Sequence, residues 1–347
     1  MTDLNLSATE LYRAGSAEKV ETDALYHITG DTNFYAIANI TEITTQAGLA
    51  DINATAAALD GNYTLLKDIA LDETGAGFED TYGWKPIGDS SDPFTGIFNG
   101  NGHKITGLWI YRPSEDFVGL FGRASSAVFK NIGVEIANGK EVKGNDYVGG
   151  IVGGAMYSTI TNSYTTGDVN GTRYVGGIAG YTNYGTITNS SATGNISGGD
   201  YYIGGIVGYV ANGSITNSYA TGNISGGDGG IAGMVYYGTV TNNAAINQQV
   251  SASSDFVNRI VSYINSSTVS NNFALDTMTV NSAIYNGATN ERNGTSKTMP
   301  ELKTQSTYSS QVDGGGLGWK FGNDVLNPWK IDANKNNGYP YLYYQDR

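Results

Sequence analysis

One sequence motif occurs four times between Val148 and Val257, and this repetition limits the folds that the chain can adopt. The copies open with VGGIVG at Val148, VGGIAG at Val175, IGGIVG at Ile203 and GGIAG at Gly229. An Asn that follows the T-I-T, S-I-T or T-V-T triplet recurs at intervals of 27, 28 and 25 residues. Weaker copies on both sides bring the units to at least six, marked by Asn131, Asn162, Asn189, Asn217, Asn242 and Asn271. Such periods are typical of solenoids, propellers or arrays.

The content of each copy selects among these architectures. Each copy holds three short stretches with strand-like alternation, separated by Gly, Asn and Asp, and none with helical periodicity. Three strands fit one coil of a parallel β-helix, in which each strand stacks on its counterpart at about 4.8 Å, whereas a propeller blade needs four strands and about 40 residues. We predict an all-β, right-handed parallel β-helix with three strands per coil of about 25–29 residues, its hand following the general preference of parallel crossovers.

The alternation also assigns directions to the side chains. In Thr159-Ile160-Thr161 and its copies, the central aliphatic residue is expected to point inward and both hydroxyls outward. The Asn marker is predicted to lie at a bend, where its amide bonds to the same amide in the neighbouring coils. The Gly-Gly pairs, such as Gly176-Gly177, are interpreted as tight corners or positions of positive φ, and not as phosphate-binding loops.

The ends of the solenoid differ from its repeats. We predict an N-terminal extension or cap at residues 1–45, with strand-like pieces at Ala24–Thr29 and Phe34–Ile43, a β-helix at residues 46–285 that is most regular at 117–275, and a C-terminal capping segment at residues 286–347. The spacing of apolar residues predicts a helix over Gln46–Leu59 that covers the first coil and protects its backbone edge. The aromatic residues near Trp319, Trp329 and Tyr339 predict a plug on the last coil.

Composition and charge narrow the function. With 49 Gly, 6 Pro and 15% charged residues, the chain suits a thin, turn-rich β-protein. A net charge of −13 argues against nucleic acid or anionic lipid as a partner, and the absence of Cys excludes disulfides and thiolate metal sites. The start of the chain lacks the features of an export signal, and no apolar run is long enough to insert into a membrane. We expect a monomer without a cofactor.

The repeats resemble a known family. The Val-Gly-Leu-Phe-Gly opening at residues 118–122, the Ile-Thr-Asn-Ser-Tyr-Ala-Thr-Gly middle at 215–222 and the Asn-Ile-Ser-Gly ends are similar to GLUG-motif repeats. The likeness is specific over Phe117–Asn247, and it extends to flanking stretches such as Trp84-Lys-Pro-Ile-Gly and Gly338-Tyr-Pro-Tyr-Leu, so that it covers residues 47–345. It implies a bacterial secreted or cell-surface protein, often adhesin-like, whose export signal is absent from this chain.

GLUG repeats also occur beside the peptidase of IgA-cleaving zinc proteases, which rely on a His-Glu-x-x-His helix. This chain has only His27 and His103, and neither is part of such a motif. We therefore expect no peptidase activity and no enzyme. The alternative is a polysaccharide-acting β-helix enzyme, a lyase or hydrolase, that uses the acid-rich loop at residues 72–92. Asp89 and Asp92 of that loop are weak candidates for a metal site.

Binding is the use that the outward residues favour. Among the 25 Tyr, two sets occupy equivalent positions in successive copies, so stacked coils turn them into rows. Such rows can hold a glycan or a host or matrix protein, or can stack only on themselves. A third hypothesis is ice binding by the ladder of Thr159/Thr161, Thr186/Thr188, Ser214/Thr216, Thr239/Thr241 and Thr268/Ser270. The candidate ligand-binding rows are Tyr147, Tyr174 and Tyr202, and Tyr157, Tyr184 and Tyr237.

Overall fold

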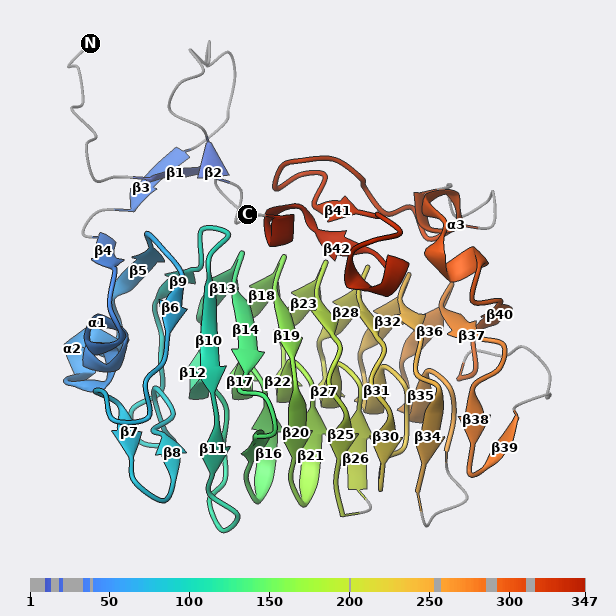
Figure 1. Cartoon of the computed structure of the whole chain (residues 1–347), viewed down its shortest axis with the longest axis horizontal. Helices are drawn as coiled ribbons and strands as arrows, with labels where there is room; N and C mark the ends of the chain where they lie inside the picture. The colour runs from blue at the N-terminus through green and yellow to red at the C-terminus, as the bar shows by residue number, and fades with distance from the viewer. Residues whose placement is uncertain are drawn as a thin grey trace.

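The computed structural model of the chain is a parallel β-helix, drawn with its long axis horizontal in Figure 1. The structure describes β1 (Glu10–Arg13), β2 (Lys19–Val20) and β3 (Phe34–Ile37), and residues 40–199, 201–252, 257–284, 292–309 and 316–346. Strand β1 pairs antiparallel with β2 and with β3. The predicted strand at residues 24–29, including His27, lies outside the described residues.

A regular coil consists of five short strands: β16 (Asp146–Gly149), β17 (Val152–Met156), β18 (Thr159–Thr161), β19 (Tyr164–Thr166) and β20 (Asp168–Asn170). The parallel β-helix is confirmed, but the coil is divided more finely than the three predicted strands. Residues in the left-handed region interrupt the extended chain between β17 and β18, between β18 and β19, and between β19 and β20, namely Tyr157, Asn162 and Gly167.

Equivalent strands of successive coils form the sheets. Sheet 1 contains β4 (Ile40–Ile43), β5 (Asn62–Leu65), β9 (Ile97–Asn99), β13 (Val128–Lys130), β18, β23 (Thr186–Thr188), β28 (Ser214–Thr216), β32 (Thr239–Thr241) and β36 (Thr268–Ser270). Sheet 2 contains β6 (Ile69–Ala70), β10 (Lys104–Leu108), β14 (Gly133–Ile136), β19, β24 (Ser191–Ala192), β29 (Tyr219–Ala220), β33 (Ala244–Ala245), β37 (Phe273–Leu275) and β40 (Thr295–Lys297).

Three further sheets complete the coils. Sheet 3 contains β7 (Phe78–Glu79), β8 (Gly83–Trp84), β11 (Ile110–Tyr111), β15 (Glu141–Lys143), β20, β25 (Ile196–Ser197), β30 (Ile224–Ser225), β34 (Gln249–Ser251), β38 (Thr279–Val280) and β39 (Ala283–Ile284). Sheet 4 contains β16, β21 (Arg173–Gly176) and β26 (Tyr201–Gly204). Sheet 5 contains β12 (Phe121–Ser125), β17, β22 (Ala179–Asn183), β27 (Val207–Ala211), β31 (Ala232–Tyr236) and β35 (Val261–Asn265).

The core is a set of stacked apolar side chains inside the coils. In sheet 1, Ile160 is in register with Ile187, which is in register with Ile215, and all three are buried. The Thr and Ser residues on either side of them are partly exposed in β18, β23 and β28, as the alternation predicts. Toward the N-terminal end the same stack continues in larger buried residues, Phe129 and Phe98.

The Gly-Gly pairs were predicted to lie at tight corners or at positive φ, and the structure contradicts the second alternative. Neither Gly176 nor Gly177 has a positive φ. A Cβ on Gly176 would lie 2.3 Å from the Ala179 carbonyl oxygen, and one on Gly177 would lie 2.4 Å from the Ala192 Cβ. Glycine is therefore required here because other chain segments approach closely, and the interpretation as positive-φ positions is wrong.

The predicted N-terminal helix is present but broken. It consists of α1 (Gln46–Ala50), η1 (Asp51–Asn53) and α2 (Ala56–Leu59), where Thr45 and Thr55 cap the two α-helices by accepting backbone N–H bonds. Leu49, Ile52 and Leu59 are buried. These helices lie at the N-terminal end of the solenoid (Figure 1), in the connection between β4 and β5, which pair in parallel. The first coil thus includes Ile40–Ile43.

The aromatic C-terminal segment runs along the side of the solenoid and does not plug its end. It contains η2 (Glu301–Lys303), α3 (Gln305–Ser309), β41 (Trp329–Lys330), η4 (Asn336–Gly338), β42 (Tyr341–Leu342) and η5 (Tyr343–Asp346), and its later elements lie over the upper edge of several coils in Figure 1. The Tyr344 hydroxyl donates to the Asn162 carbonyl at 2.6 Å, and the Trp319 indole donates to that of Asn242 at 2.8 Å. The segment therefore follows the row of Asn bends, whose carbonyls accept these bonds.

Candidate functional site

The first predicted Tyr row is half-buried and stacked. Phe117, Tyr147 and Tyr174 lie face to face, with ring centroids 4.6 Å apart at each step and planes within 5°. Tyr202 continues the row at 5.5 Å with a tilt of 28°. Burial is the largest cause that raises the pKa of Tyr147 and of Tyr202. Because each ring covers its neighbour, this row (the half-buried row) presents mainly edges and hydroxyls to solvent.

A third set of aromatic residues flanks the half-buried row and was not predicted as a site. Tyr181 and Tyr209 occupy equivalent positions on β22 and β27, and Tyr263 follows two coils later on β35. The Tyr181 ring lies 5.7 Å from Tyr147, and Tyr209 lies 5.9 Å from Tyr174. Burial raises the pKa of Tyr181 to about 12. Because Gly154 and Met234 occupy this position in other coils, the alignment of the repeats indicates an aromatic row here only weakly.

The second predicted row is far more exposed. Tyr157, Tyr184 and Tyr237 are 57%, 54% and 56% exposed. The rings of Tyr157 and Tyr184 stack at 5.1 Å, whereas Tyr237 packs edge-on against Tyr236 at 4.5 Å. We call these three residues the exposed row.

All residues of the exposed row have a backbone conformation that disfavours bulky side chains. Their φ values are 50°, 52° and 49°, and the left-handed region costs an ordinary residue about 1–2 kcal/mol. The same bend in other coils is made by Ser126, Asn212 and Ser266, also at positive φ. The fold therefore accepts small polar residues at this bend, and it does not require tyrosine.

The Asn markers lie at left-handed bends in all six coils, with φ between 48° and 61°. Amide bonds join Asn162 to Asn131 at 3.3 Å and Asn271 to Asn242 at 2.6 Å. Asn131 also donates to Asn99, one coil earlier, at 3.4 Å. The marker amides at these positions thus connect coils to one another, and Asn162 and Asn271 also donate to carbonyls of the C-terminal segment.

The outward hydroxyls of sheet 1 also bond along the solenoid. Thr216 donates to Thr188 at 3.0 Å, and Ser214 donates to Thr186 at 3.4 Å. In these two pairs, the hydroxyl groups of neighbouring coils therefore form hydrogen bonds with each other.

The acid-rich loop is divided among separate local interactions. Asp89 accepts hydrogen bonds from the backbone N–H groups of Ser91 and Asp92, and these bonds form a local turn. Asp72 accepts two bonds from Thr74, which lower its pKa. Glu79 pairs with the buried Arg112 at 2.7 Å. Among the described residues, no group of three or more His, Cys, Asp or Glu side chains is arranged to hold a metal ion, so Asp89 and Asp92 do not form part of such a group.

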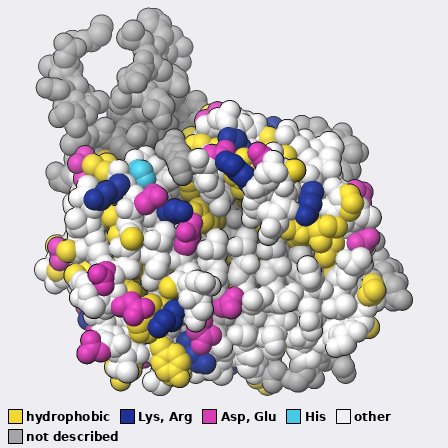
Figure 2. Space-filling model, viewed as in Figure 1, with side chains coloured by type: hydrophobic (Ala, Val, Ile, Leu, Met, Phe, Trp, Pro, Cys, Tyr) yellow, Lys and Arg dark blue, Asp and Glu magenta, His cyan; other side chains and the backbone are white. Residues whose placement is uncertain are grey.

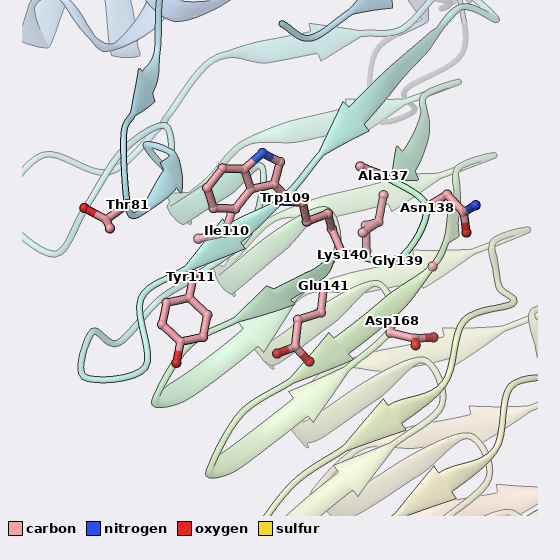
Figure 3. A pocket seen from close by; sticks show the side chains of 12 residues that line it. Thr81, Trp109, Ile110, Tyr111, Ala137, Asn138, Gly139, Lys140, Glu141 and Asp168 are labelled. Carbon is pink, nitrogen blue, oxygen red and sulfur yellow. The ribbon is translucent and has the colours of Figure 1, made fainter. Parts of the chain in front are cut away.

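A groove opens at the corner between sheets 2 and 3, where three coils meet (Figure 3). Its volume is about 780 Å³, and its lining includes Trp109, Tyr111, Asn138, Lys140, Glu141 and Asp168. In two of these coils a single residue, Trp109 or Gly167, connects the strand of sheet 2 to the strand of sheet 3. In the coil between them this connection is four residues long, 137–140. The longer loop protrudes beside its shorter neighbours and forms the groove. No feature of the sequence singled out this site.

Comparison with known proteins identifies the repeats. Residues 144–170, 171–197 and 199–225 match the family model described as the GLUG motif. Halomucin of Haloquadratum walsbyi is 37% identical over 133 residues, which are 37% of this chain and 1% of halomucin. A protein of Evansella cellulosilytica, provisionally named a Gly-rich membrane protein, is 52% identical over 40 residues, or 12% of this chain and 5% of that protein. The chain thus spans only a small part of these relatives.

The fold also has a solved counterpart. A crystal structure of a protein from Bacteroides ovatus, provisionally described as an immunoglobulin A1 protease, superimposes with a TM-score of 0.63 at 22% identity, covering 87% of this chain and 92% of that one. This likeness concerns the fold. Among the described residues, no helix is long and apolar enough to cross a membrane. The chain is therefore a parallel β-solenoid that carries GLUG-motif repeats.

Proposed function

We propose that the protein is a non-enzymatic, adhesin-like module of a surface or secreted protein, and that it binds a protein partner through the exposed row. The observation that carries the proposal is the presence of three tyrosines, each more than half exposed, at strained bends where other coils have Ser or Asn. Backbone strain of this kind clusters at functional sites; the half-buried row has similar φ values, 59°, 56° and 55° at Tyr147, Tyr174 and Tyr202, so it is the exposure that distinguishes the exposed row. GLUG repeats on a β-solenoid fit a surface or secreted protein, and the name of the Evansella relative supports that setting.

The ring geometry suits a protein partner at this row. Tyr157 and Tyr184 lie parallel within 4° and cover each other's facing surfaces. What they present outward is ring edges with hydroxyl tips, and such amphipathic groups are enriched in protein interfaces. The acids of the 72–92 loop are held in turns and ion pairs, which supports the non-enzymatic assignment.

The test exchanges the exposed row for residues that the fold already uses. The triple variant Tyr157→Ser, Tyr184→Asn, Tyr237→Ser copies the side chains found at equivalent bends and should unfold at the same or a higher urea concentration than the parent. Surface plasmon resonance against a panel of extracellular matrix proteins should show binding by the parent, and a loss of at least about tenfold in the variant, equivalent to about 1.4 kcal/mol.

Tyr263→Ala is the matched control, because Tyr263 is also exposed but lies outside the row on sheet 5. It should bind like the parent. Equal binding by the parent and the triple variant would contradict the role of the exposed row. Release of oligosaccharides from any polysaccharide during incubation with the parent would instead favour the enzyme that uses residues 72–92.

A further inference from the structure

The groove beside Trp109 has the composition of a site for a small polar ligand with one apolar side. Tyr111 is 49% exposed, and Trp109 is 9% exposed beneath the Lys140 side chain, whose Nζ lies 4.5 Å from the indole centroid. The carboxylates of Glu141 and Asp168 follow these rings along the groove (Figure 3), whose lining also includes Asn138 and Lys140. A groove of about 780 Å³ falls within the range that small-molecule sites occupy.

The Trp109 indole supplies an independent indication of a ligand. Its Nε1 is buried and has no hydrogen-bond acceptor in the part of the chain that the structure describes. A buried donor without an acceptor costs about 1–3 kcal/mol. A ligand hydroxyl group that reached this edge of the indole would provide the missing acceptor.

The charged side chains of the groove interact with neighbouring residues of the protein. Lys140 lies 3.8 Å from Glu73, and Glu141 lies 3.6 Å from Lys143. Asp168 accepts two bonds from Asn195, through its backbone and side-chain nitrogens. The Lys140 ammonium is thus already close to a carboxylate, and the carboxylates of Glu141 and Asp168 disfavour an anionic ligand. A neutral ligand rich in hydroxyl groups can both donate and accept hydrogen bonds here.

The groove continues along the solenoid as a line of polar side chains. Glu141 is in register with Asp168, and Asn195 and Asn223 follow on the next two coils. A second groove, about 530 Å³ in volume, begins at Asn195 and Asn223. The coils repeat at about 4.8 Å, close to the length of one residue in an extended sugar chain. In Figure 2 the middle of this face is largely uncharged, whereas charged side chains gather over the early coils.

From these observations we infer that the corner between sheets 2 and 3 binds a neutral oligosaccharide. One sugar ring occupies the groove at Trp109 and Tyr111, and the following rings lie along Asp168, Asn195 and Asn223. This site is separate from the exposed row, so either assignment can fail without the other.

Isothermal titration calorimetry of the full chain with neutral glucan, galactan, mannan and xylan oligomers, and with a uronate oligomer, tests the site. At least one neutral oligomer should bind, and a hexamer should bind more tightly than a dimer. Tyr111→Ala should weaken binding of both lengths by about tenfold, equivalent to about 1.4 kcal/mol. Asn223→Ala should weaken the hexamer only, because a dimer held at Trp109 does not reach that coil.

Trp109→Phe distinguishes a binding role from a structural one. The substitution keeps a ring and removes the unpartnered donor, so the midpoint of urea unfolding should stay the same or rise while sugar affinity falls. The Tyr157, Tyr184, Tyr237 triple variant should bind the sugar like the parent. The inference is overturned if no neutral oligomer binds, if only the uronate binds, or if Tyr111→Ala leaves the affinity unchanged.

Discussion

Asn162 has a φ of 48°, and its side-chain amide donates to Asn131 in the previous coil and to the Val325 carbonyl of the C-terminal segment. Asparagine is one of the few residues that adopt this backbone region readily. Its side chain then points along the row of bends, where an amide both donates and accepts. Local conformation and contact between coils thus favour the same residue at each bend, which explains why the marker was readable from the sequence.

Asn162→Ala should lower the free energy of unfolding by about 2–3 kcal/mol, since it removes both amide bonds and puts a Cβ-bearing residue into the left-handed region without a compensating side chain. Asn162→Gly should cost about 1 kcal/mol less, because glycine adopts this φ without strain. Urea unfolding of both variants measures the two contributions. Equal losses would show that the backbone conformation contributes nothing to the preference for Asn.

For the tyrosines, recurrence in the sequence did not determine how exposed each side chain is. Their recurrence predicted rows, and the structure contains stacked rings in both sets. Which row is half-buried and which is exposed depends on neighbours from other strands, such as Tyr181 and Tyr209 beside the half-buried row. The sequence alone did not contain that difference.

A strand of sheet 1 has one buried and two partly exposed side chains, and its stability is expected to follow this division. Ile187 is buried between Ile160 and Ile215 in neighbouring coils. Ile187→Ala should cost about 2–5 kcal/mol because it leaves a cavity in the stack. Thr188→Ala, one residue away, should cost about 1 kcal/mol through loss of the bond with Thr216. Similar shifts of the urea midpoint for both variants would contradict the inward and outward assignment.

The N-terminal helical element shows which part of an element a pattern predicts. The apolar spacing gave the buried face correctly, with Leu49, Ile52 and Leu59 inside. The spacing did not predict the break between the two α-helices. Asn53 bonds to the Pro86 carbonyl and to the Gly88 N–H group, and Thr55 then begins a new helix as its N-cap. These partners lie more than 30 residues away, so the local sequence contained no sign of them.

In the whole molecule, the C-terminal segment lies against the side of the solenoid. Tyr219 anchors it: the buried hydroxyl donates to the Pro340 carbonyl at 2.6 Å and accepts from the Asn336 amide at 2.6 Å. Burial raises the pKa of Tyr219 to about 12 from an ordinary value of 10. The folded state therefore holds this proton more tightly than the unfolded state, and its contribution is fully present below pH 10 and is lost as the pH rises toward 12.

Stability of the parent should accordingly fall between pH 10 and pH 12 by about 1.4 kcal/mol per pH unit for this group, with further losses from other buried tyrosines. Tyr219→Phe should be less stable than the parent at pH 8 by about 1–3 kcal/mol, and its stability should decline less steeply above pH 10. Urea unfolding at several pH values measures both. Parallel pH profiles for parent and variant would exclude Tyr219 as a contributor.

The sequence by itself determined the stacking unit of this protein. The period, the alternation and the Asn markers specify a parallel β-helix because every coil repeats the same local geometry, and stacking identical coils fixes the register of Ile, Asn and Tyr together. The tertiary structure alone decided where the C-terminal segment lies and where a groove opens. The contact of Tyr344 with Asn162 joins residues 182 positions apart, and the groove at Trp109 arises from a difference in loop length between adjacent coils, which has no effect until the coils are stacked.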